Sequence, residues 1–539
     1  MDTTNTIKQL LRNQLEALGL SVSIEDIQLT IPKSLEFGDF STNAAMIFAK
    51  KLNKKSWDFA LELATGLQDP TLVKVVAVPP GFINFFVSSN VYDSLINEIY
   101  QKGPAFGKKS FNGKRINVEF VSANPTGELH LGHARGAAVG DAISRILEND
   151  GYEVTREYYV NDAGNQINNL ALSLRSRYLD LYKIKNVFPE DGYHSLGLID
   201  IAKDLQTKYG DTLIHSDDLE IFRRFGKLAE LKQIKKVLRQ FRIKFDVFTF
   251  ETKLRKPKLI KHYLDLLRPN TYVLDEALFL KTSAYLDDKD RPIQKSNGEY
   301  TYLLPDIIYH DDKARRGYDQ LIDVLGADHH GYINRMKSAL MMLGYPKDLL
   351  EIEIIQMVRL IKDGVEFKMS KRSGNAVSME ELMNDVGVDA VRYFFLEKAP
   401  SSHLDFDLTL AMDHSTKNPL YYIEYAHARL FKMIEKAQKV ITPLFETNLL
   451  TSEVETALLK CLNDYKKEVE EASRARLPSK VTNYLQRLSS LVHQFYVSSR
   501  VLGNDVEALS RQRLALCIAT RIIINNGLNL LGIKAYNNM

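Results

Sequence analysis

The sequence predicts an α/β protein built on a parallel sheet, with an α+β domain before the sheet and an all-α domain after it. A strand, loop, helix, strand unit spans residues 116 to 160, and a strand, loop, helix unit recurs at 320 to 344. This order is typical of parallel strands that are connected by helices. From about Asn418 to the end, the sequence shows only helical periodicity, which predicts the separate all-α domain.

The composition is that of a folded globular protein, with 45% hydrophobic and 26% charged residues. A chain of 539 residues is too long for one core and predicts roughly three or four domains. Only two cysteines are present, Cys461 and Cys517, which argues against a disulfide framework or thiolate zinc sites and favours the reducing cytoplasm. No signal peptide is evident, and no apolar run approaches the roughly 18 residues that span a bilayer. The net charge of +3 permits nucleic-acid binding without requiring it.

The first hundred or so residues mix helical stretches with short strands such as "LVKVVAVPPGFINFFVSS". The basic segment "KGPAFGKKSFNGKR" follows, and it misses the phosphate-loop pattern: five residues rather than four separate Gly107 from Gly113, and Arg115 replaces Ser or Thr. We interpret this segment as a linker. The domains are therefore expected at residues 1–108, 109–400 and 401–539.

The sequence of the central domain predicts two related strand, loop, helix units. In the first, "INVEFVS" predicts a strand, residues 122 to 127 a loop, and the next residues a helix that runs to Asp150, with Gly151 as its stop. "EVTREYYVND" predicts the following strand. In the second unit, "QLIDVLG" predicts a strand, "ADHHGY" a loop and "INRMKSALMMLG" a helix. Residues about 170 to 300 are expected to form a long insertion, which includes the basic helical run "RRFGKLAELKQIKKVLRQFR".

A hairpin and a basic loop follow the second unit. Two apolar runs meet at Asp363-Gly364, which is a strong turn signal, and Ser378 with Glu381 forms a capping-box pattern. Between them lies "KMSKR", Lys368 to Arg372. A short basic run is usually a solvated face. Directly after a hairpin, however, it also has the placement of a loop that closes over a triphosphate and neutralises a departing pyrophosphate.

The stretch "GELHLGHARG" places His130 and His133 three residues apart at the start of the first helix. A metal site is disfavoured, because no glutamate of the H-E-x-x-H type lies between the histidines and no clear third ligand is present. A pair of structural surface histidines is one remaining interpretation. Phosphate binding is favoured, because a helix N-terminus attracts anions and imidazole donors suit electrostatic catalysis of nucleotidyl transfer.

Together, "HLGH" and "KMSK", about 240 residues apart, resemble the two signature motifs of class I aminoacyl-tRNA synthetases. The stretches "VEFVSANPTGELHLGHARGAAVGD", "GADHHGY" and "YIEYAHARL" resemble the arginyl-tRNA synthetase family in particular. The likeness extends from "SLEFGDFSTNAAM" and "PPGFINFF" to the final "LGIKAYNNM", which is essentially the whole chain. It implies a Rossmann-type catalytic core and a reaction that uses ATP with Mg²⁺. Many relatives depart from KMSK at the second lysine, whereas this chain keeps Lys371.

The resemblance assigns catalysis to both histidines and both lysines of the two motifs, with the lysines holding pyrophosphate. The ATP-binding positions that it implies are His130, Gly132, His133, Gly326, Asp328, Lys368, Met369, Ser370 and Lys371. The arginine-binding positions that it implies are Glu119, Asn124, Tyr302, Asp306 and His329.

An arginine pocket needs carboxylates and acceptors, because a guanidinium is planar, always charged and rich in donors. Glu119 and Asp306 are placed where strands deliver residues to a ligand crevice, and both are expected to pair with the guanidinium. Asn124 would hold the α-amino or carboxylate end and Tyr302 would form a wall of the pocket. Sequence periodicity alone would instead make Glu119 a surface charge and Tyr302 a core residue.

The "GADHHG" stretch offers Asp328, His329 and His330 as potential metal ligands. Three adjacent residues do not converge easily on one ion, so we expect this stretch to belong to the ATP and amino-acid crevice and predict no protein-bound metal. No large hydrolytic domain is evident. A pocket that pairs a guanidinium discriminates against neutral analogues by a factor of ~10⁴–10⁵ without editing. Lysine, which is also a cation, remains the main competing amino acid.

Contacts with tRNA are expected from both ends of the chain. In the N-terminal domain, Phe82 and Asn84 match positions where an aromatic and an amide meet an unpaired base, whereas Phe85 and Phe86 are expected in the core. In the C-terminal helices, Tyr421, Tyr425 and Arg429 recur at a spacing of four, and the resemblance makes this the anticodon-binding domain. A half-buried tyrosine stripe is the alternative.

The sequence thus predicts a cytoplasmic enzyme that charges tRNA with arginine, in two steps through an arginyl-adenylate. By resemblance it is a monomer, and its first step requires bound tRNA. Its expected partners are the tRNA for arginine, arginine and ATP, without a membrane. Two alternatives stay open: a small-molecule nucleotidyltransferase, which also uses an HxGH pair, and a catalytically silent tRNA-binding protein.

Overall fold

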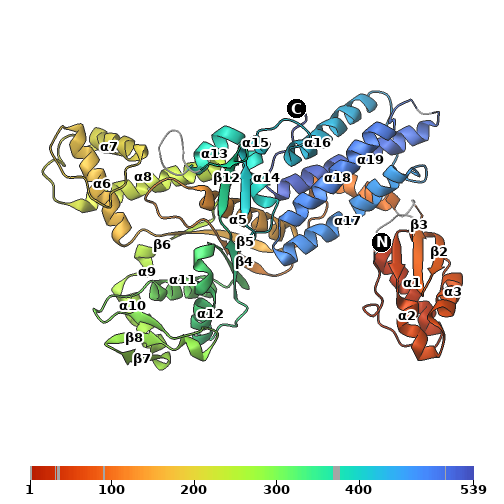
Figure 1. Cartoon of the computed structure of the whole chain (residues 1–539), viewed down its shortest axis with the longest axis horizontal. Helices are drawn as coiled ribbons and strands as arrows, with labels where there is room; N and C mark the ends of the chain where they lie inside the picture. Colours follow the sequence, from red (N-terminus) through yellow and green to blue (C-terminus); the bar gives the residue numbers. More distant parts are fainter. Residues whose placement is uncertain (1–2, 31, 33–36, 89–91, 368–376, 504) are drawn as a thin grey trace. The chain divides into compact units, whose positions relative to one another are not determined.

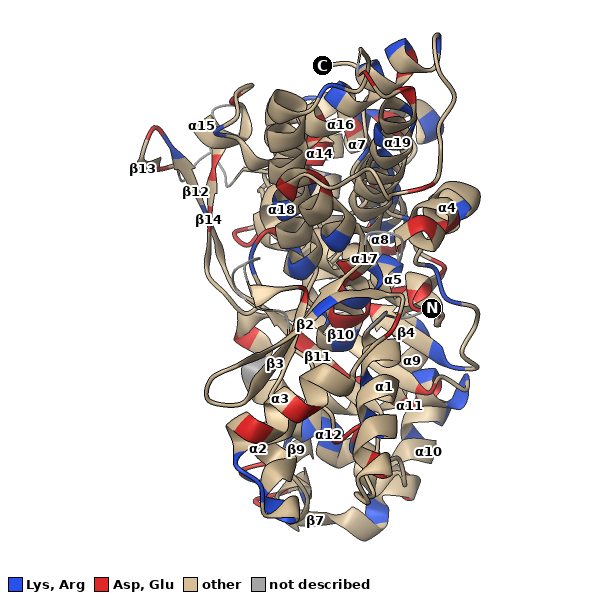
Figure 2. Ribbon diagram, turned by 90° about the vertical axis from the view of Figure 1, so that its right-hand side faces the viewer, with Lys and Arg blue, Asp and Glu red and all other residues tan. Residues whose placement is uncertain are grey.

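The computed structural model describes residues 3–30, 32, 37–88, 92–367, 377–503 and 505–539. The described chain divides into two compact units. The first contains Met1–Phe106, Arg429–Asp464 and Ser490–Ile523, and the second contains Gly107–Ala428, Tyr465–Ser489 and Ile524–Met539. Basic and acidic residues are both distributed over many elements of the chain, in keeping with the small net charge of +3 (Figure 2).

The N-terminal part packs helices on a small antiparallel sheet of order β1-β3-β2. Apolar residues at helical spacing along the first helix, such as Ile7, Leu11 and Leu15, form its core with Ile83 and Phe85 of the sheet. Its elements are α1 (Thr3–Ala17), β1 (Phe40–Thr42), α2 (Ala44–Phe48), η2 (Ala49–Leu52), α3 (Ser56–Gly66), β2 (Leu72–Val78), β3 (Phe82–Val87), α4 (Asp93–Lys102) and η4 (Gly103–Ala105).

The second unit is built on a five-stranded sheet of order β11-β10-β4-β5-β6, in which every neighbouring pair is parallel (Figure 1). Both predicted strand, loop, helix units are confirmed. The elements that form them are β4 (Arg115–Glu119), α5 (Leu131–Asn149), β5 (Glu153–Val160), β10 (Gln320–Gly326), η7 (Ala327–Tyr332), α12 (Ile333–Met342) and β11 (Leu350–Ile355). The predicted "ADHHGY" loop is the short 3₁₀ helix η7.

The stretch expected to be an insertion contains a strand of the main sheet. β6 (Val247–Phe250) pairs with β5, so this part of the stretch completes the sheet. Before it, α6 (Asn165–Leu181), α7 (Leu196–Tyr209) and α8 (Leu219–Gln240) share their own core of Leu174, Tyr178 and Phe222. After it come α9 (Glu251–Leu254), α10 (Pro257–Leu267), η5 (Arg268–Asn270), β7 (Thr271–Leu274), β8 (Ala277–Leu280), η6 (Thr282–Ala284), β9 (Arg291–Gln294) and α11 (Leu303–Arg315).

The predicted hairpin is confirmed at Asp363 and Gly364. Both residues have positive φ, +52° and +78°, as a tight hairpin turn requires, and they join β12 (Val358–Lys362) to the antiparallel β13 (Val365–Glu366). The remaining elements are α13 (Met379–Val386), α14 (Val388–Leu396), β14 (Leu404–Asp407), α15 (Leu408–Ala411), α16 (Pro419–Ala437), α17 (Glu453–Ala475), α18 (Ser479–Ser498) and α19 (Glu507–Leu530). No described helix is long and apolar enough to cross a membrane.

Two buried arginines fix α5 and α14 within the second unit. The Arg135 guanidinium donates to the carbonyl oxygens of Gln356, Ala399 and Ser402 at 2.8–3.0 Å. Arg392 of α14 pairs with Asp141 of α5 at 2.5 Å, and both side chains are almost completely buried. These bonds satisfy charges that would be costly to bury alone, so they hold the helix that carries "HLGH" in one place.

Gly140 of α5 tests this packing, because a Cβ at this position would lie 2.3 Å from the Phe120 ring. We expect Gly140→Ala to lower the free energy of unfolding by about 1–3 kcal/mol through overpacking. Gly136→Ala on the same helix is the matched control, since its Cβ would meet nothing within 4 Å. Urea denaturation followed by circular dichroism measures both, and equal stability of the two variants contradicts the packing account.

Candidate active site

The "HLGH" histidines form the first turn of α5. His130 is the N-cap residue, and its Nδ1 accepts the backbone N–H of Gly132 at 3.1 Å. The Nδ1 of His133 accepts the backbone N–H of His130 at 3.2 Å. The two rings stack with centroids 3.7 Å apart. The histidines therefore replace the Ser/Glu pair of an ordinary capping box and satisfy two free N–H groups of the helix start.

This hydrogen bonding fixes the protons of both rings. A neutral imidazole whose Nδ1 accepts a hydrogen bond carries its proton on Nε2, so each ring keeps one N–H donor for a ligand. Desolvation, together with the neighbouring His130, lowers the pKa of His133 to about 3, and desolvation also lowers the pKa of His130. At neutral pH the turn thus offers two neutral donors beside the positive end of the helix dipole, an arrangement that suits a phosphate.

The chain that follows "KMSK" is fastened to this same turn. Met379 donates its backbone N–H to the carbonyl oxygen of Leu129 at 2.7 Å, and Ser378 forms a β-bridge with His130. The predicted capping box is confirmed, with Ser378 and Glu381 exchanging bonds of 3.0 and 3.2 Å at the start of α13. The predicted ATP-binding residues of the basic loop, Lys368, Met369, Ser370 and Lys371, lie outside the described residues.

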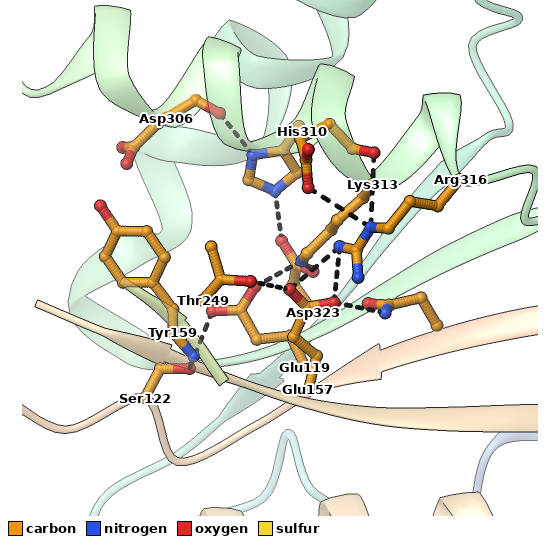
Figure 3. A network of polar contacts seen from close by, with 12 residues as sticks. Glu119, Ser122, Glu157, Tyr159, Thr249, Asp306, His310, Lys313, Arg316 and Asp323 are labelled. Carbon is orange, nitrogen blue, oxygen red and sulfur yellow. Dashed lines mark hydrogen bonds and ion pairs between the residues drawn. The ribbon is translucent and has the colours of Figure 1, made fainter. Parts of the chain in front are cut away.

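A buried ion cluster joins the end of β4 to β10 and α11 (Figure 3). Glu119 and Asp323 are register partners on these two strands, and the Lys313 ammonium bonds to both carboxylates, to Asp323 at 2.8 Å. The Ser122 hydroxyl donates to the other oxygen of Glu119 at 2.8 Å. His310, one turn before Lys313 on α11, lies 2.7 Å from Asp323.

The same cluster also has the donor set of a metal site. One ligand atom each from Glu119, His310 and Asp323 lie within 4.8 Å of one another. The Lys313 ammonium, however, already bonds to two of these three groups. Because the chain itself supplies the cation, the carboxylates hold an internal ion pair rather than ligands waiting for a metal.

Asp306 is placed differently from the sequence expectation. It lies in the first turn of α11 rather than at a strand end, because the chain turns into a helix at Tyr302. Burial, which is opposed by His310 and reinforced by the nearby carboxylates of Glu251 and Glu119, raises the pKa of the Asp306 carboxyl to about 7. Within the described part of the chain, no hydrogen bond or ion pair reaches this carboxyl group, which points away from Lys313 (Figure 3).

The two predicted acids of the arginine pocket therefore have different roles in the structure. Glu119 is buried and bonded to Lys313, and its pairing with a substrate guanidinium stays a prediction. Asp306 is the unpaired acid. Tyr302 is 77% exposed at the start of α11, which contradicts its alternative as a core residue. Asn124 is half-buried in the loop after β4 and donates to the side chain of Gln166.

The "GADHHG" residues end β10 and form η7. Gly326 is the last residue of the strand, and Asp328 and His329 form an exposed pair at 3.4 Å. This segment directly follows β10, the strand that contributes Asp323 to the ion cluster. His310, Lys313 and Asp323 were not among the predicted site residues. The available signals were a charged residue within the apolar strand "QLIDVLG" and the helical spacing of three between His310 and Lys313.

The predicted tRNA-binding residues differ in exposure. Phe82 of β3 is 37% exposed, whereas Asn84 is 4% exposed between β1 and β2, so burial weighs against a direct base contact by Asn84. Phe85 is fully buried, as expected for a core residue. Phe86 is half-buried, with the Lys74 ammonium 5.5 Å from its ring.

On α16, the predicted tyrosines are half-buried and form a pair. Tyr421 and Tyr425 stack with ring centroids 5.8 Å apart and an angle of 24° between the rings. Farther along the helix, Arg429 bonds to His493 at 3.2 Å and lies 4.3 Å from the Tyr496 ring. The predicted positions are therefore an aromatic stack and a guanidinium held by another helix.

Comparisons with known proteins agree with this fold. Residues 95–408 match the profile described as "tRNA synthetases class I (R), catalytic domain", residues 5–87 the "Arginyl tRNA synthetase N terminal domain", and residues 423–539 the "DALR anticodon binding domain". The parallel sheet, with two histidines at its first helix, is thus the catalytic core of a class I aminoacyl-tRNA synthetase.

The particular family follows from full-length relatives. The chain is 44% identical to arginine–tRNA ligase 1 of Halalkalibacterium halodurans and 44% identical to arginine–tRNA ligase of Bacillus subtilis, each over 100% of both chains. The arginyl-tRNA synthetase of Thermus thermophilus has the same fold, with a TM-score of 0.73, 22% identity and 99% of each chain covered. The chain belongs to the arginine–tRNA ligase family.

The state of the histidine pair is open to direct measurement. We expect ¹H–¹⁵N correlation spectra of ¹⁵N-histidine-labelled protein at pH 7 to show His130 and His133 as neutral rings protonated on Nε2. Since the pKa of His133 is lowered from 6.5 to about 3, its signals should not titrate between pH 7 and pH 4. In this range the unfolded chain binds the proton and the folded chain does not, so acid lowers the free energy of unfolding. An imidazolium signal for His133 at pH 5 contradicts this assignment.

Proposed function

We propose that this arginine–tRNA ligase activates arginine at the edge of the parallel sheet between the "HLGH" turn and α11. The arginine carboxylate attacks the α-phosphate of ATP, which gives arginyl-adenylate and pyrophosphate. A terminal ribose hydroxyl of the tRNA then takes the arginyl group and releases AMP. The observation that carries the proposal is the unpaired Asp306 carboxyl, which lies beside a balanced ion cluster and offers one negative charge to a cationic substrate.

The neutral donors of His130 and His133 stabilise the charge that develops on the ATP phosphates. Both rings are held by backbone hydrogen bonds, so no reorganisation is needed when the charge develops. ATP enters as its Mg²⁺ complex, and the metal is part of the substrate. Gly132 leaves room for the phosphates to approach the helix start, and Gly326 and Asp328 line the nucleotide side. Lys368 and Lys371 receive the departing pyrophosphate, and Met369 and Ser370 contact ATP.

Arginine recognition divides between the two ends of the substrate. The Asp306 carboxylate pairs with the guanidinium, and Tyr302 forms a wall beside it. Asn124 and His329 hold the amino-acid end, and Glu119, kept in place by Lys313 and Ser122, supplies an oriented acceptor. No covalent intermediate with the enzyme is needed, because positioning and charge stabilisation are sufficient for adenylate transfer.

The flanking parts of the chain bind the tRNA for arginine. We assign residues 1–108 to contact with unpaired bases, with Phe82 as the exposed aromatic, and residues 401–539 to the anticodon. Stacking on Tyr421 or Tyr425 contributes about 1–3 kcal/mol per base. Residues 109–400 form the catalytic part. The enzyme acts as a cytoplasmic monomer, and its first step depends on bound tRNA.

The histidine role is tested by pyrophosphate exchange. We expect His130→Ala or His133→Ala to lower the turnover of arginine-dependent exchange of labelled pyrophosphate into ATP by ~10²-fold in the presence of the tRNA, because each loses one oriented donor. The exposed His262 of α10 supplies the matched control, His262→Ala. Unchanged exchange in both motif variants, or exchange in the wild type that ignores the tRNA, contradicts the corresponding part of the proposal.

The arginine role of Asp306 has a pH signature. We expect Asp306→Asn to raise KM for arginine at least about tenfold with little change in KM for ATP, since a charged hydrogen-bond partner of the guanidinium is lost. In the wild type, KM for arginine should rise as the pH falls below about 7, because the pKa of Asp306 is about 7 and its protonated form has no charge to pair. A pH-independent KM between pH 6 and pH 8 argues against the assignment.

A further inference from the structure

We infer that Lys313 is a positioning residue that sets the pocket's preference for a guanidinium over an ammonium. It does so by occupying the place between Glu119 and Asp323 where a substrate ammonium would otherwise bind. The inference deepens the proposed function and rests on it. Lys313 was not among the residues that the sequence indicated, and its side chain does not have to touch the substrate to have this effect.

The first support is the burial and bonding of the Lys313 ammonium. The side chain is completely buried on α11, and its Nζ donates to Glu119 and, at 2.8 Å, to Asp323. The same Nζ lies 4.3 Å from the centroid of the Tyr309 ring. Two carboxylates and an aromatic face are the ordinary surroundings of a bound ammonium ion. The structure therefore contains an ammonium site, and a lysine of the chain fills it.

The second support is the charge of His310. Its Nδ1 lies 2.8 Å from the backbone carbonyl oxygen of Asp306, and its Nε2 lies 2.7 Å from the Asp323 carboxylate. Both partners are acceptors, so both ring nitrogens must donate, which requires the imidazolium. The raised pKa of His310 beside Asp323 agrees with this. Lys313 and His310 thus supply two positive charges against the two negative charges of Glu119 and Asp323.

The third support is that the neighbouring acids are also paired. Glu157 accepts from Arg316 at 2.7 Å and from Thr249 at 2.6 Å. Glu251 pairs with Arg255 at 2.5 Å, and Asp311 pairs with Arg315 at 2.6 Å. Among the described residues of this region, the Asp306 carboxyl is the acid left without a cation. One unpaired carboxylate can pair with one cationic side chain of a substrate. The arginine guanidinium is such a cation, and its N–H donors form a planar fork.

Loss of Lys313 changes this balance in a specific direction. Glu119 and Asp323 would keep their buried negative charges without the ammonium between them, and such charges attract any small cation that reaches them. The side chain of lysine ends in the same ammonium group that was removed. A variant without Lys313 is therefore expected to accept lysine better relative to arginine, whereas a purely structural role of Lys313 would impair both substrates alike.

The test compares arginine and lysine as substrates of pyrophosphate exchange in the presence of the tRNA for arginine. For Lys313→Met, we expect the ratio of kcat/KM for arginine to that for lysine to fall at least about tenfold. Lys313→Arg, which restores a cation between the carboxylates, should recover most of the ratio. Lys337→Met is the matched control, because Lys337 of α12 is a largely buried lysine that contacts Glu351, at 3.7 Å, outside the cluster.

An unchanged ratio in folded, active Lys313→Met overturns the inference. If Lys313→Met does not fold, Lys313→Gln, which keeps a donor in place of the charge, must show the same fall. Failure of both variants to fold, while Lys337→Met folds, leaves Lys313 a structural role only and overturns the inference too. Absence of arginine-dependent exchange in the wild type is a separate result: it contradicts the proposed function itself, and the inference fails with it.

Discussion

The ion cluster between β4, β10 and α11 is the constraint on which the site depends. A single carboxylate or ammonium is too costly to bury, so Glu119, Asp323 and Lys313 are tolerated only as a hydrogen-bonded group. Because Lys313 lies on α11 and its partners lie on two strands, forming the group fixes the helix against the sheet. The position of Asp306, two turns earlier on the same helix, follows from this attachment.

The "HLGH" turn provides partners for the backbone N–H groups at the start of α5. The first turn of a helix leaves N–H groups without partners, and capping residues usually satisfy them. Here two imidazoles accept these bonds, which keeps their Nδ1 atoms unprotonated and leaves Nε2–H groups for a ligand. Desolvation lowers the pKa of both rings, so neither adds a positive charge. In the proposed function, this turn meets an anion through oriented dipoles, whereas the unpaired carboxyl beside α11 meets a cation.

The sequence predicts those features that are set by interactions between neighbouring residues. The turn at Asp363-Gly364, the cap at Ser378 and the end of α5 before Gly151 are each set by a few adjacent residues, and all three are confirmed. The pairing of Glu119 with Lys313 joins residues 194 positions apart, and no local pattern contains it.

The same reason explains the partial success at the site. Resemblance to a family indicated Glu119 and Asp306, but it did not distinguish a paired carboxylate from an unpaired one. Periodicity also did not show that Asp306 begins a helix, because "YTYLLPD" has the apolar character of a strand. Exposure depends on the packing of neighbouring strands, so the burial of Asn84 beside the exposed Phe82 became visible only in the folded sheet.

The most direct test of the account is the proton balance of arginine binding, measured by calorimetry at pH 7 in two buffers of different ionisation enthalpy. A carboxyl group with a pKa of about 7 is about half protonated at this pH, and a bound guanidinium ionises it. We therefore expect the wild type to release about half a proton per arginine bound and Asp306→Asn to release none. Arginine binding by the wild type without proton release would contradict the claim that Asp306 is the unpaired acid of the pocket.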